Sequence, residues 1–182
     1  DTGILIDKGV TNVVVKDLAI QKFNQSAITL TENATDITIS NNDISNIEVF
    51  GIIMNRHCRN CIVNDNTISD VLGRGISMLE PQHCEITGNR IIRTGMIAGH
   101  GFDGVNSGVA ICMENDETRE ANSKSIAKHN RIAHNRIDST GYGAIRADGA
   151  YNTIEYNVVR DAVLTMNDGG AIYCWGNSYV YT

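Results

Sequence analysis

The chain has 182 residues, enough for one domain with a sizeable core and too few for two ordinary domains. Fifteen Lys and Arg stand against 21 Asp and Glu, which gives a formal net charge of −6, and no run of like charges occurs. This composition excludes the basic face that nucleic-acid binders and anionic-membrane binders need.

Pro occurs once and Gly 17 times, and single Asn and Gly residues separate short apolar runs. Such punctuation is typical of many short strands joined by tight turns. No apolar stretch reaches the roughly 20 residues that span a bilayer, so we expect no membrane span. We expect one domain over 1–182, and the closing NSYVYT reads as a strand just begun, so the chain could be a piece of a longer protein.

One pattern recurs along the chain: an aliphatic residue, Asn three positions later, and another aliphatic residue two positions after that. Its copies are, in chain order, ISNNDI (Asn42), VNDNTI (Asn66), ITGNRI (Asn89), IAHNRI (Asn135) and IEYNVV (Asn157). An earlier segment, VKDLAI, has Leu18 in the Asn place and belongs to the first coil. The Asn positions lie 24, 23, 46 and 22 residues apart. A fixed period of this length is typical of solenoids.

A second element follows each copy, a small residue leading into a short alternating run: SAITL, FGIIM, RGISM, SGVAI, YGAI and GGAI. Each period therefore holds at least two short strands and has room for a third. A unit of this kind buries its apolar face only by stacking on its neighbours. We predict an all-β, single-stranded parallel β-helix of about six to seven coils, in which the stacked asparagines form hydrogen-bonded ladders.

The five cysteines follow no disulfide-framework spacing. HCRNC, with His83 and Cys84 further on, suggests zinc, yet it lacks the two matched ligand pairs of a structural site, so we expect buried packing and no metal centre. Cys61 and Cys84 should stack on adjacent coils, either as free thiols or as a disulfide.

The Asn-marked coils resemble the right-handed parallel β-helix proteins of the pectate-lyase-like superfamily over essentially the whole chain. Two stretches, GMIAGHGFDGVNSGVAI and LTMNDGGAIYCWG, are similar to segments of bacterial β-helix proteins presumed to act on polysaccharides. The resemblance implies the fold and leaves the reaction open, because hydrolases, lyases, epimerases and non-enzymatic surface proteins share it.

The departures from the period indicate where function lies. Between Asn89 and Asn135 we expect one coil with two insertions, near 95–107 and 115–124, and a smaller excess lengthens the last coil at 161–168. Loops gathered on one side of a repeat fold commonly build its binding face.

Aligning the strands on their AI pair predicts one inward column of Met54, Met78, Ile111, Ile145 and Ile172. The outward columns then read Thr31, Asn55, Leu79, Cys112, Arg146 and Tyr173, and, two residues on, Asn33, His57, Pro81, Glu114, Asp148 and Trp175. In this register Glu114 and Asp148 lie on adjacent coils about 5 Å apart, near the carboxyl separation of retaining glycosidases. The alternative is two solvated turn acids.

Asp168 precedes the paired glycines of GGAIY, either as a catalytic acid or as part of an Asp-Gly turn. The candidate catalytic acids are thus Asp168, Asp148 and Glu114. The candidate substrate-binding residues are Arg146, Tyr173 and Trp175, the aromatic ones as sugar platforms, with His100 and Asp103 reaching over from the first insertion.

We expect a secreted or cell-surface, monomeric enzyme that cleaves glycosidic bonds of an extracellular polysaccharide, with hydrolysis preferred. The alternatives are β-elimination on a uronate-containing glycan, which the lack of lysine in the outward columns disfavours, and a non-catalytic glycan-binding or adhesin β-helix. No cofactor is expected to be required, although Asp148 and Asp168 could recruit calcium.

Overall fold

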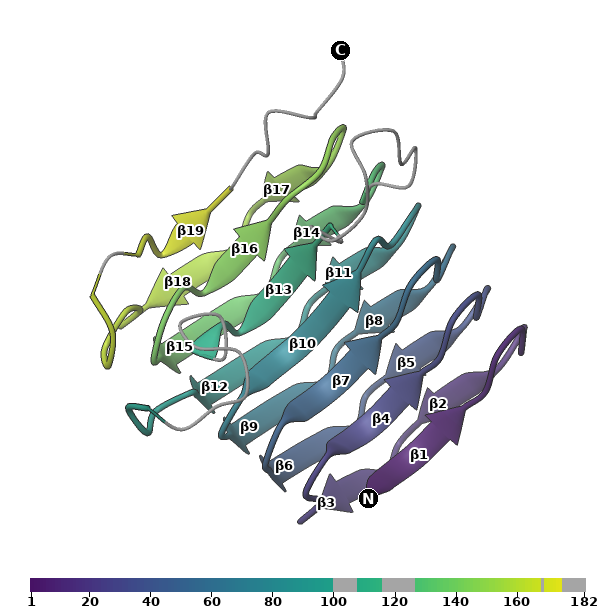
Figure 1. Ribbon diagram of the computed structural model, residues 1–182, viewed down its shortest axis with the longest axis horizontal. Coiled ribbons are helices and arrows are strands. Elements are labelled where there is room, and N and C mark those ends of the chain that lie inside the picture. The colour runs from purple at the N-terminus through teal and green to yellow at the C-terminus, as the bar shows by residue number, and fades with distance from the viewer. Residues whose placement is uncertain (100–107, 116–126, 168, 175–182) are drawn as a thin grey trace.

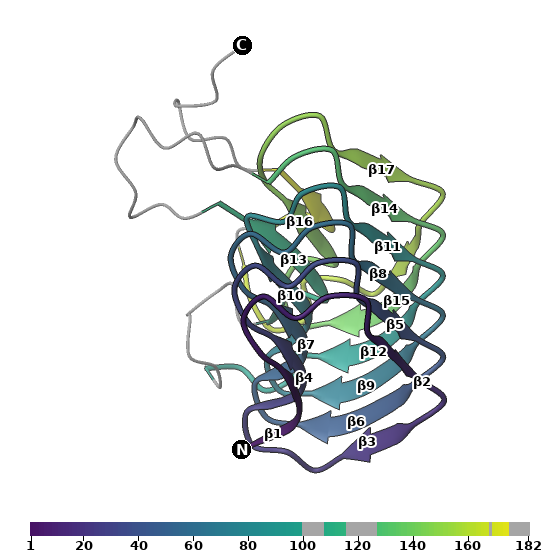
Figure 2. The ribbon, with the colours of Figure 1, turned by 90° about the vertical axis from the view of Figure 1, so that its right-hand side faces the viewer.

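The computed structural model describes residues 1–99, 108–115, 127–167 and 169–174 of the chain. The strands of this part wind into a parallel β-helix whose coils stack in sequence order from the N-terminus to the C-terminus (Figure 1). Each full coil contributes one strand to each of three sheets, which form three sides of the stack (Figure 2). The predicted fold class is confirmed, with three strands per coil.

The first sheet has seven strands and carries the inward columns of the core. Its strands are β1 (Thr2–Ile6), β4 (Ser26–Leu30), β7 (Phe50–Met54), β10 (Arg74–Leu79), β13 (Ile111–Glu114), β16 (Ile145–Ala147) and β19 (Ile172–Tyr173). We refer to it as the first sheet throughout.

The other two sheets have six strands each. One consists of β2 (Val14–Lys16), β5 (Thr38–Ser40), β8 (Ile62–Asn64), β11 (Glu85–Thr87), β14 (Arg131–Ala133) and β17 (Thr153–Glu155), and the other of β3 (Ala19–Gln21), β6 (Asp43–Ile47), β9 (Thr67–Val71), β12 (Arg90–Thr94), β15 (Arg136–Thr140) and β18 (Val158–Arg160). All their pairings are parallel and join each coil to the next.

The asparagine ladder is confirmed and runs through the buried turn between the second and third sheets. Each side chain donates to the carboxamide oxygen of the next coil's asparagine, from Asn42 to Asn66, then Asn89 and Asn135, and finally Asn157, at 3.0 Å each time. The hydrogen bond between Asn89 and Asn135 shows that the 46-residue interval is one coil, as predicted.

The insertions leave this coil on either side of β13. The chain departs after Thr94 and returns at Ile111, then departs again after Glu114 and rejoins the coil at Ala127. At the second exit, Asn115 Oδ1 accepts a hydrogen bond from the Ala127 backbone N–H at 2.8 Å, which closes the base of the loop. Residues 100–107 and 116–126, which hold most of both predicted insertions, lie outside the described residues.

The predicted register of the first sheet is right for its last three strands and wrong for the earlier ones. Ile111, Ile145 and Ile172 align as expected, but their partners in earlier coils are Ile76 and Ile52. Met54 and Met78 instead align with Met113. The outward column is consequently Thr29, Ile53, Ser77, Cys112, Arg146 and Tyr173, and Glu114 pairs with Leu79 where the sequence suggested Pro81.

A column of very small residues fixes this register. The residue before each inward isoleucine is Gly51, Gly75, Ala110 or Ala144, at or directly before the start of its strand in the first sheet. A Cβ on Gly75 would lie 2.7 Å from the Ala110 carbonyl oxygen and 2.9 Å from Ile91 Cγ2. Only small residues fit there, because close-packed neighbours leave no volume for a larger one.

Ile172 also differs from expectation. It belongs to the inward column, but it is 50% exposed because β19 is the edge strand of its sheet among the described residues.

Candidate functional site

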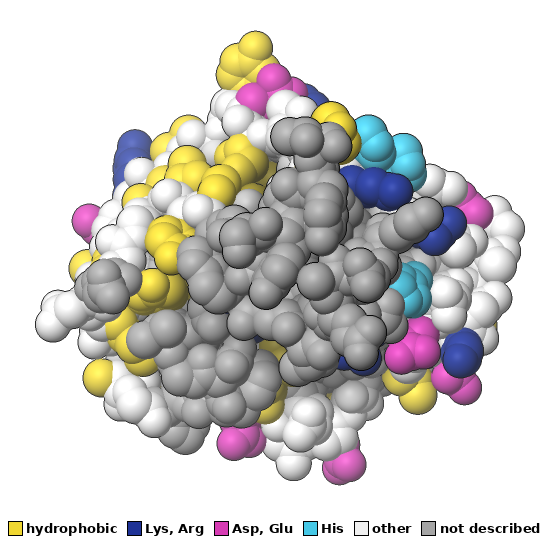
Figure 3. All heavy atoms as spheres, turned by 45° about the horizontal axis from the view of Figure 1, so that its top comes forward, with side chains coloured by type: hydrophobic (Ala, Val, Ile, Leu, Met, Phe, Trp, Pro, Cys, Tyr) yellow, Lys and Arg dark blue, Asp and Glu magenta, His cyan; other side chains and the backbone are white. Residues whose placement is uncertain are grey.

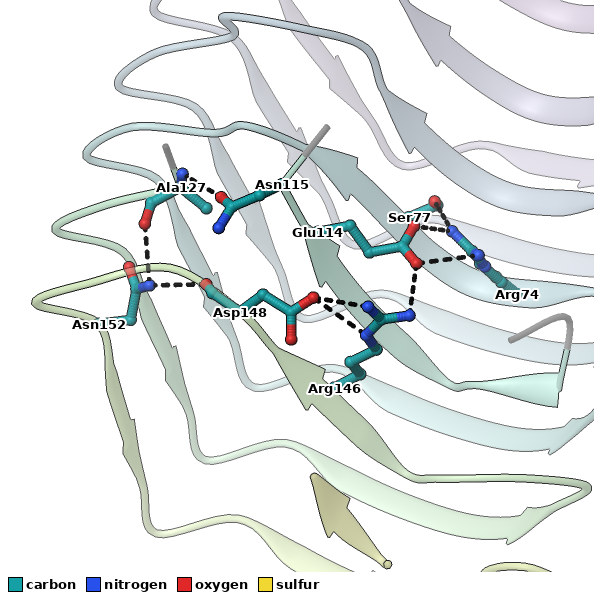
Figure 4. Close-up of polar contacts among 8 residues, drawn as sticks. All are labelled: Arg74, Ser77, Glu114, Asn115, Ala127, Arg146, Asp148 and Asn152. Atoms are coloured by element: carbon teal, nitrogen blue, oxygen red, sulfur yellow. Dashed lines mark hydrogen bonds and ion pairs between the residues drawn. The ribbon is translucent and has the colours of Figure 1, made fainter. Parts of the chain in front are cut away.

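Four charged side chains meet on the outward face of the first sheet, across three adjacent strands. Arg74 comes from β10, Glu114 from the end of β13, Arg146 from β16, and Asp148 from the turn that follows β16. We call this set the ion network; Figure 4 shows it in close-up. One of its strands, β13, has an insertion before it and another after it.

Arg146 lies at the centre of the ion network. Its Nη1 donates to Glu114 Oε1 at 2.8 Å, while its Nη2 and Nε donate to Asp148 Oδ2 at 2.7 and 3.1 Å. The guanidinium therefore stands between the two carboxylates, as Figure 4 shows. The sequence predicted the adjacency of Glu114 and Asp148 and did not predict a bridging cation.

Arg74 holds the other side of Glu114. Its Nη1 donates to Glu114 Oε2 at 2.6 Å and to Ser77 Oγ at 3.1 Å, and its Nη2 lies 3.3 Å from Glu114 Oε1. Sequence reasoning missed Arg74, although the arginine that opens RGISM was a visible signal. Arg74 begins its strand, well before the residue that pairs with Glu114, and only its long side chain brings it within reach.

The ion network is nearly closed to solvent. The side chains of Arg74, Arg146 and Asp148 are 4, 5 and 5% exposed, whereas that of Glu114 is 17% exposed. Two arginines against two carboxylates leave the network formally neutral, and buried charges are tolerated only in such paired arrangements. Glu114 is thus the most accessible of the four.

The two carboxylate partners of Arg146 favour the charged form of its guanidinium. Burial acts to lower the pKa of Arg146, but the hydrogen bonds and charge of Asp148 and the charge of Glu114 offset it, and the net pKa lies above its usual range. Cys112 lies on the rung between Ser77 and Arg146, and burial raises the pKa of its thiol well above the ordinary value. Because the thiolate is the nucleophile, Cys112 is an unreactive packing residue.

The turn after β16 is held by Asn152. Its Nδ2 donates to the carbonyl oxygens of Asp148 and Ala127, both at 3.1 Å. These bonds fix the backbone of Asp148 relative to the coil below, so the carboxylate faces Arg146 with little freedom (Figure 4).

A small apolar cluster lies outside the main core, apart from the main inward columns. It contains buried Val109, Cys112 and Tyr142, with Val163 and Met166 packed against them. Gly169 belongs beside it, because a Cβ there would meet the Tyr142 ring at 2.4 Å. The first glycine of GGAIY is therefore explained by contact with the protein's own tyrosine, and a ligand is not needed to account for it.

The remaining predicted site residues divide into two groups. Tyr173 aligns with Arg146 on the outward column, as expected, and is half-buried. Asp168, Trp175, His100 and Asp103 lie outside the described residues, and their roles stay predictions.

The cysteines near the HCRNC segment are buried, free thiols. Cys61 and Cys84 stack on adjacent coils as expected; their mutual hydrogen bond lowers the pKa of Cys61 and raises that of Cys84, while burial raises the pKa of Cys58 to about 12. Each thiol also donates to a backbone carbonyl, at 3.5 Å for Cys58, 3.3 Å for Cys61 and 3.4 Å for Cys84. His83 points away to the exposed surface, so the zinc grouping suggested by the sequence is not assembled.

Taken together, the fold and the ion network define a β-helix protein with a polar outward site on one sheet. The chain matches the family described as "Periplasmic copper-binding protein (NosD)" over residues 1–181, and it belongs to this family. Comparisons with curated proteins and with solved structures found no match.

The family description corrects one expectation and agrees with another. The expectation of no required cofactor, with calcium as an option, is contradicted, because the family is described as copper-binding. The periplasm is outside the cytoplasm, which is compatible with the location that we expected. The described residues contain no helix of the length and apolarity that crossing a membrane requires.

The donor groups of the described residues offer copper no enclosed centre. Within these residues no group of three or more His, Cys, Asp or Glu could hold a metal ion. The buried thiols hydrogen-bond to backbone carbonyl groups, whereas a metal ligand must be a thiolate. A copper site in this part of the chain is thus limited to fewer protein ligands.

Proposed function

We propose that the chain acts on a polysaccharide bound across the outward face of the first sheet, from β10 to β19, and that it hydrolyses a glycosidic bond. The observation that supports this is the ion network. A purely structural role on that face would be filled at least as well by apolar residues, because burying ion pairs rarely increases stability. The earlier coils indeed have Thr29 and Ile53 in the same column.

The hydrogen bonds within the ion network suggest a catalytic role for each carboxylate. Glycoside hydrolysis needs one ionised carboxylate, to stabilise positive charge on the sugar, and one protonated acid, to protonate the leaving oxygen. Glu114 accepts hydrogen bonds from two arginines, and it is the most exposed member of the network. Glu114 therefore suits the role of the ionised carboxylate, with Arg74 and Arg146 positioning it.

The acid must come from elsewhere. The Asp148 side chain is 5% exposed and is bound to Arg146 at 2.7 Å, so it lacks access to the leaving oxygen of a bound sugar. This replaces the catalytic pair of Glu114 and Asp148 that their adjacency suggested, and it leaves Asp168 as the predicted acid. Elimination is less well supported, because both arginines of the network are committed to carboxylates of the protein itself.

The test uses purified chain and a panel of neutral and uronate-containing polysaccharides. Hydrolysis produces new reducing ends, elimination produces unsaturated products that absorb in the ultraviolet, and binding alone produces neither. We expect reducing ends only. Glu114→Gln and Asp168→Asn should each lower kcat by about 100-fold or more, because each removes a group that acts in the transition state.

The matched control is Glu155→Gln. Glu155 is also paired with an arginine, Arg131, at 2.8 Å, but it lies on β17 of another sheet. It should leave activity unchanged. No product from any polysaccharide, or an unchanged rate in Glu114→Gln, would contradict the proposed hydrolysis.

Copper binding is a second candidate function, which the family description brings to this chain. One arrangement on the surface favours it: two exposed histidines stacked on adjacent coils, with ring centroids 5.0 Å apart. Imidazole is a ligand that copper accepts readily.

A further inference from the structure

The carboxyl ends of four neighbouring strands of the first sheet carry titratable side chains. His57 lies in the turn after β7, Glu80 follows β10, Glu114 ends β13, and Asp148 follows β16. These strands are parallel and paired in sequence order, so their carboxyl ends meet at one edge of the sheet, as the arrowheads in Figure 1 show. The four residues therefore form a row along the axis of the stack, with about 4.8 Å between coils.

His57 and Glu80 are the half of this row that the ion network does not contain. His57 Nδ1 lies 3.6 Å from Glu80 Oε2, within the distance of an ion pair. The Glu80 side chain is 1% exposed and that of His57 is 24% exposed. Histidine (cyan) and acidic (magenta) side chains also reach the surface next to one another on the face that Figure 3 shows. The pair thus has a buried acidic end and an imidazole that reaches the surface.

The backbone joins this pair to the ion network. Leu79 pairs with Glu114 in the first sheet, and the Glu80 backbone N–H donates to the Glu114 carbonyl oxygen at 2.8 Å. His57 lies one coil further from Glu114, so two coil spacings, about 10 Å, separate them along the axis. This separation leaves room for a sugar ring and a water molecule between the two side chains.

The corners of the coils repeatedly adopt the left-handed backbone conformation. At the carboxyl edge of the first sheet, φ is 61° at Asn33, 64° at His57 and 52° at Glu80. Asn and His are comparatively common in this conformation, whereas Glu is not, so Glu80 needs a reason other than backbone preference. Its pairing with His57 supplies one. A second column of such corners, before the second sheet, holds in successive coils Asn12, Asp36, Asn60, His83, His129 and Tyr151.

An imidazole backed by a carboxylate is suited to general base catalysis. The carboxylate orients the ring and stabilises the imidazolium that forms when the ring takes up a proton. Because Nδ1 faces Glu80, the proton acceptor would be Nε2, on the other edge of the ring. The proposed hydrolysis names no group that activates water, since Glu114 stabilises charge on the sugar and the acid serves the leaving oxygen.

We propose that His57 is the general base that activates water in this hydrolysis and that Glu80 positions its ring. Nε2 takes a proton from water, and the water oxygen bonds to the anomeric carbon as the glycosidic C–O bond breaks. The leaving oxygen takes a proton from the acid, and exchange with solvent restores both groups. Because water displaces the leaving group directly, the anomeric configuration is inverted. The inference rests on the proposed function and extends the polysaccharide path by one coil, to the turn after β7.

The test compares His57→Gly with His134→Gly on a polysaccharide that the unaltered chain hydrolyses. Both positions are left-handed, with φ of 64° and 57°, and glycine adopts this conformation without strain. Gly88 already occupies the place of His134 one coil earlier, with φ of 67°, so the control is matched in backbone and in the group removed. Circular dichroism verifies that the β-helix is intact in both variants.

We expect His57→Gly to lower kcat by about 100-fold or more and to leave KM nearly unchanged, because a general base acts only in the transition state. Added imidazole should restore part of the lost rate in His57→Gly and none in Glu114→Gln. Glu80→Gln should lower kcat by less than His57→Gly does, and His134→Gly should leave it unchanged. Nuclear magnetic resonance of the first product should show an inverted anomeric configuration.

Four results would overturn the role of His57 and leave the hydrolysis standing. These are an unchanged kcat in His57→Gly, an equal loss in His134→Gly, a loss that imidazole does not restore, and a product of retained configuration. A different result separates the two proposals. If the unaltered chain hydrolyses no polysaccharide, the proposed function fails, and the role of His57 as its base fails with it.

Discussion

The coils before β10 and those from β10 onward share one interior and differ on the outside. Both halves have the same inward isoleucines and the same asparagine ladder. In the early half the outward column carries Thr29 and Ile53, and the chain passes from β9 to β10 without an insertion. In the later half the same column carries Arg146 and Tyr173, and insertions flank β13.

This difference teaches that the repeat alone fixes the interior, while the outward face varies from coil to coil. Each coil contacts only its neighbours, so a change on one coil's surface need not disturb the others. The charges accumulate where insertions leave the coil, around β13, which has one insertion before it and another after it. That coincidence, more than any single residue, distinguishes the candidate site from the rest of the surface.

The largest expected effect separates the buried ion network from the exposed pair of Arg93 and Asp70, which joins the two halves. Arg146→Met would leave the buried Asp148 without its guanidinium and Glu114 with one partner fewer, at a cost of about 3–5 kcal/mol in the free energy of unfolding. Arg93→Met breaks the exposed pair with Asp70 and should cost less than about 0.5 kcal/mol. Denaturant unfolding of both variants measures the loss in the free energy of unfolding. Similar losses in the two variants would contradict the expected difference between the buried and the exposed pair.

The next effect tests whether the interior really is the same in both halves. Asn66→Ala in the early half and Asn135→Ala in the later half each remove a buried carboxamide that bonds the coils on either side. Each should cost about 2–4 kcal/mol, because buried backbone groups lose their partners. Unfolding free energies that differ by more than about 1 kcal/mol would mean that the insertions alter the core.

The smallest effect concerns pH. Hydrogen bonds from Arg93 lower the pKa of Asp70, so the folded state binds the Asp70 proton less tightly than the unfolded state does. The pair's contribution is therefore present above the unfolded pKa of about 3.9 and is lost as the pH falls below it. Because both side chains are well exposed, the effect should stay below about 1 kcal/mol and shrink with added salt.

Thermal melting of the unaltered chain and Asp70→Asn between about pH 2 and 6 measures this contribution. The two curves should differ at the upper end and converge at the lower end. A difference that grows as the pH falls would contradict the assigned sign.

The fold was predictable because its signal is repeated. Five asparagines in one place per coil specified the period, the ladder and the single coil between Asn89 and Asn135. The register of the early strands was wrong because these strands have no AI pair, and their methionines were aligned with it in place of Ile52 and Ile76. The column of Gly51, Gly75, Ala110 and Ala144 would have corrected it, since packing forbids a larger residue there.

The candidate site was predictable only in part, for a physical reason. Periodicity places Cα atoms on rungs, and it correctly put Glu114 beside Asp148 and Arg146 beside Tyr173. It does not say where a long side chain ends. The guanidinium groups of Arg146 and Arg74 lie between and beside the carboxylates, and this changes the role expected of Glu114 from a partner in an acid pair to a carboxylate held by two arginines.

The left-handed corners have a consequence for how such a protein can diversify. In one column the backbone keeps the same conformation while the side chain changes from Asn60 to His83 and on to Tyr151. A mutation at a corner therefore replaces one surface group without moving the main chain on either side. Members of a family built in this way could acquire or lose a metal ligand, or an aromatic contact, by single substitutions that leave the rest of the structure nearly unchanged.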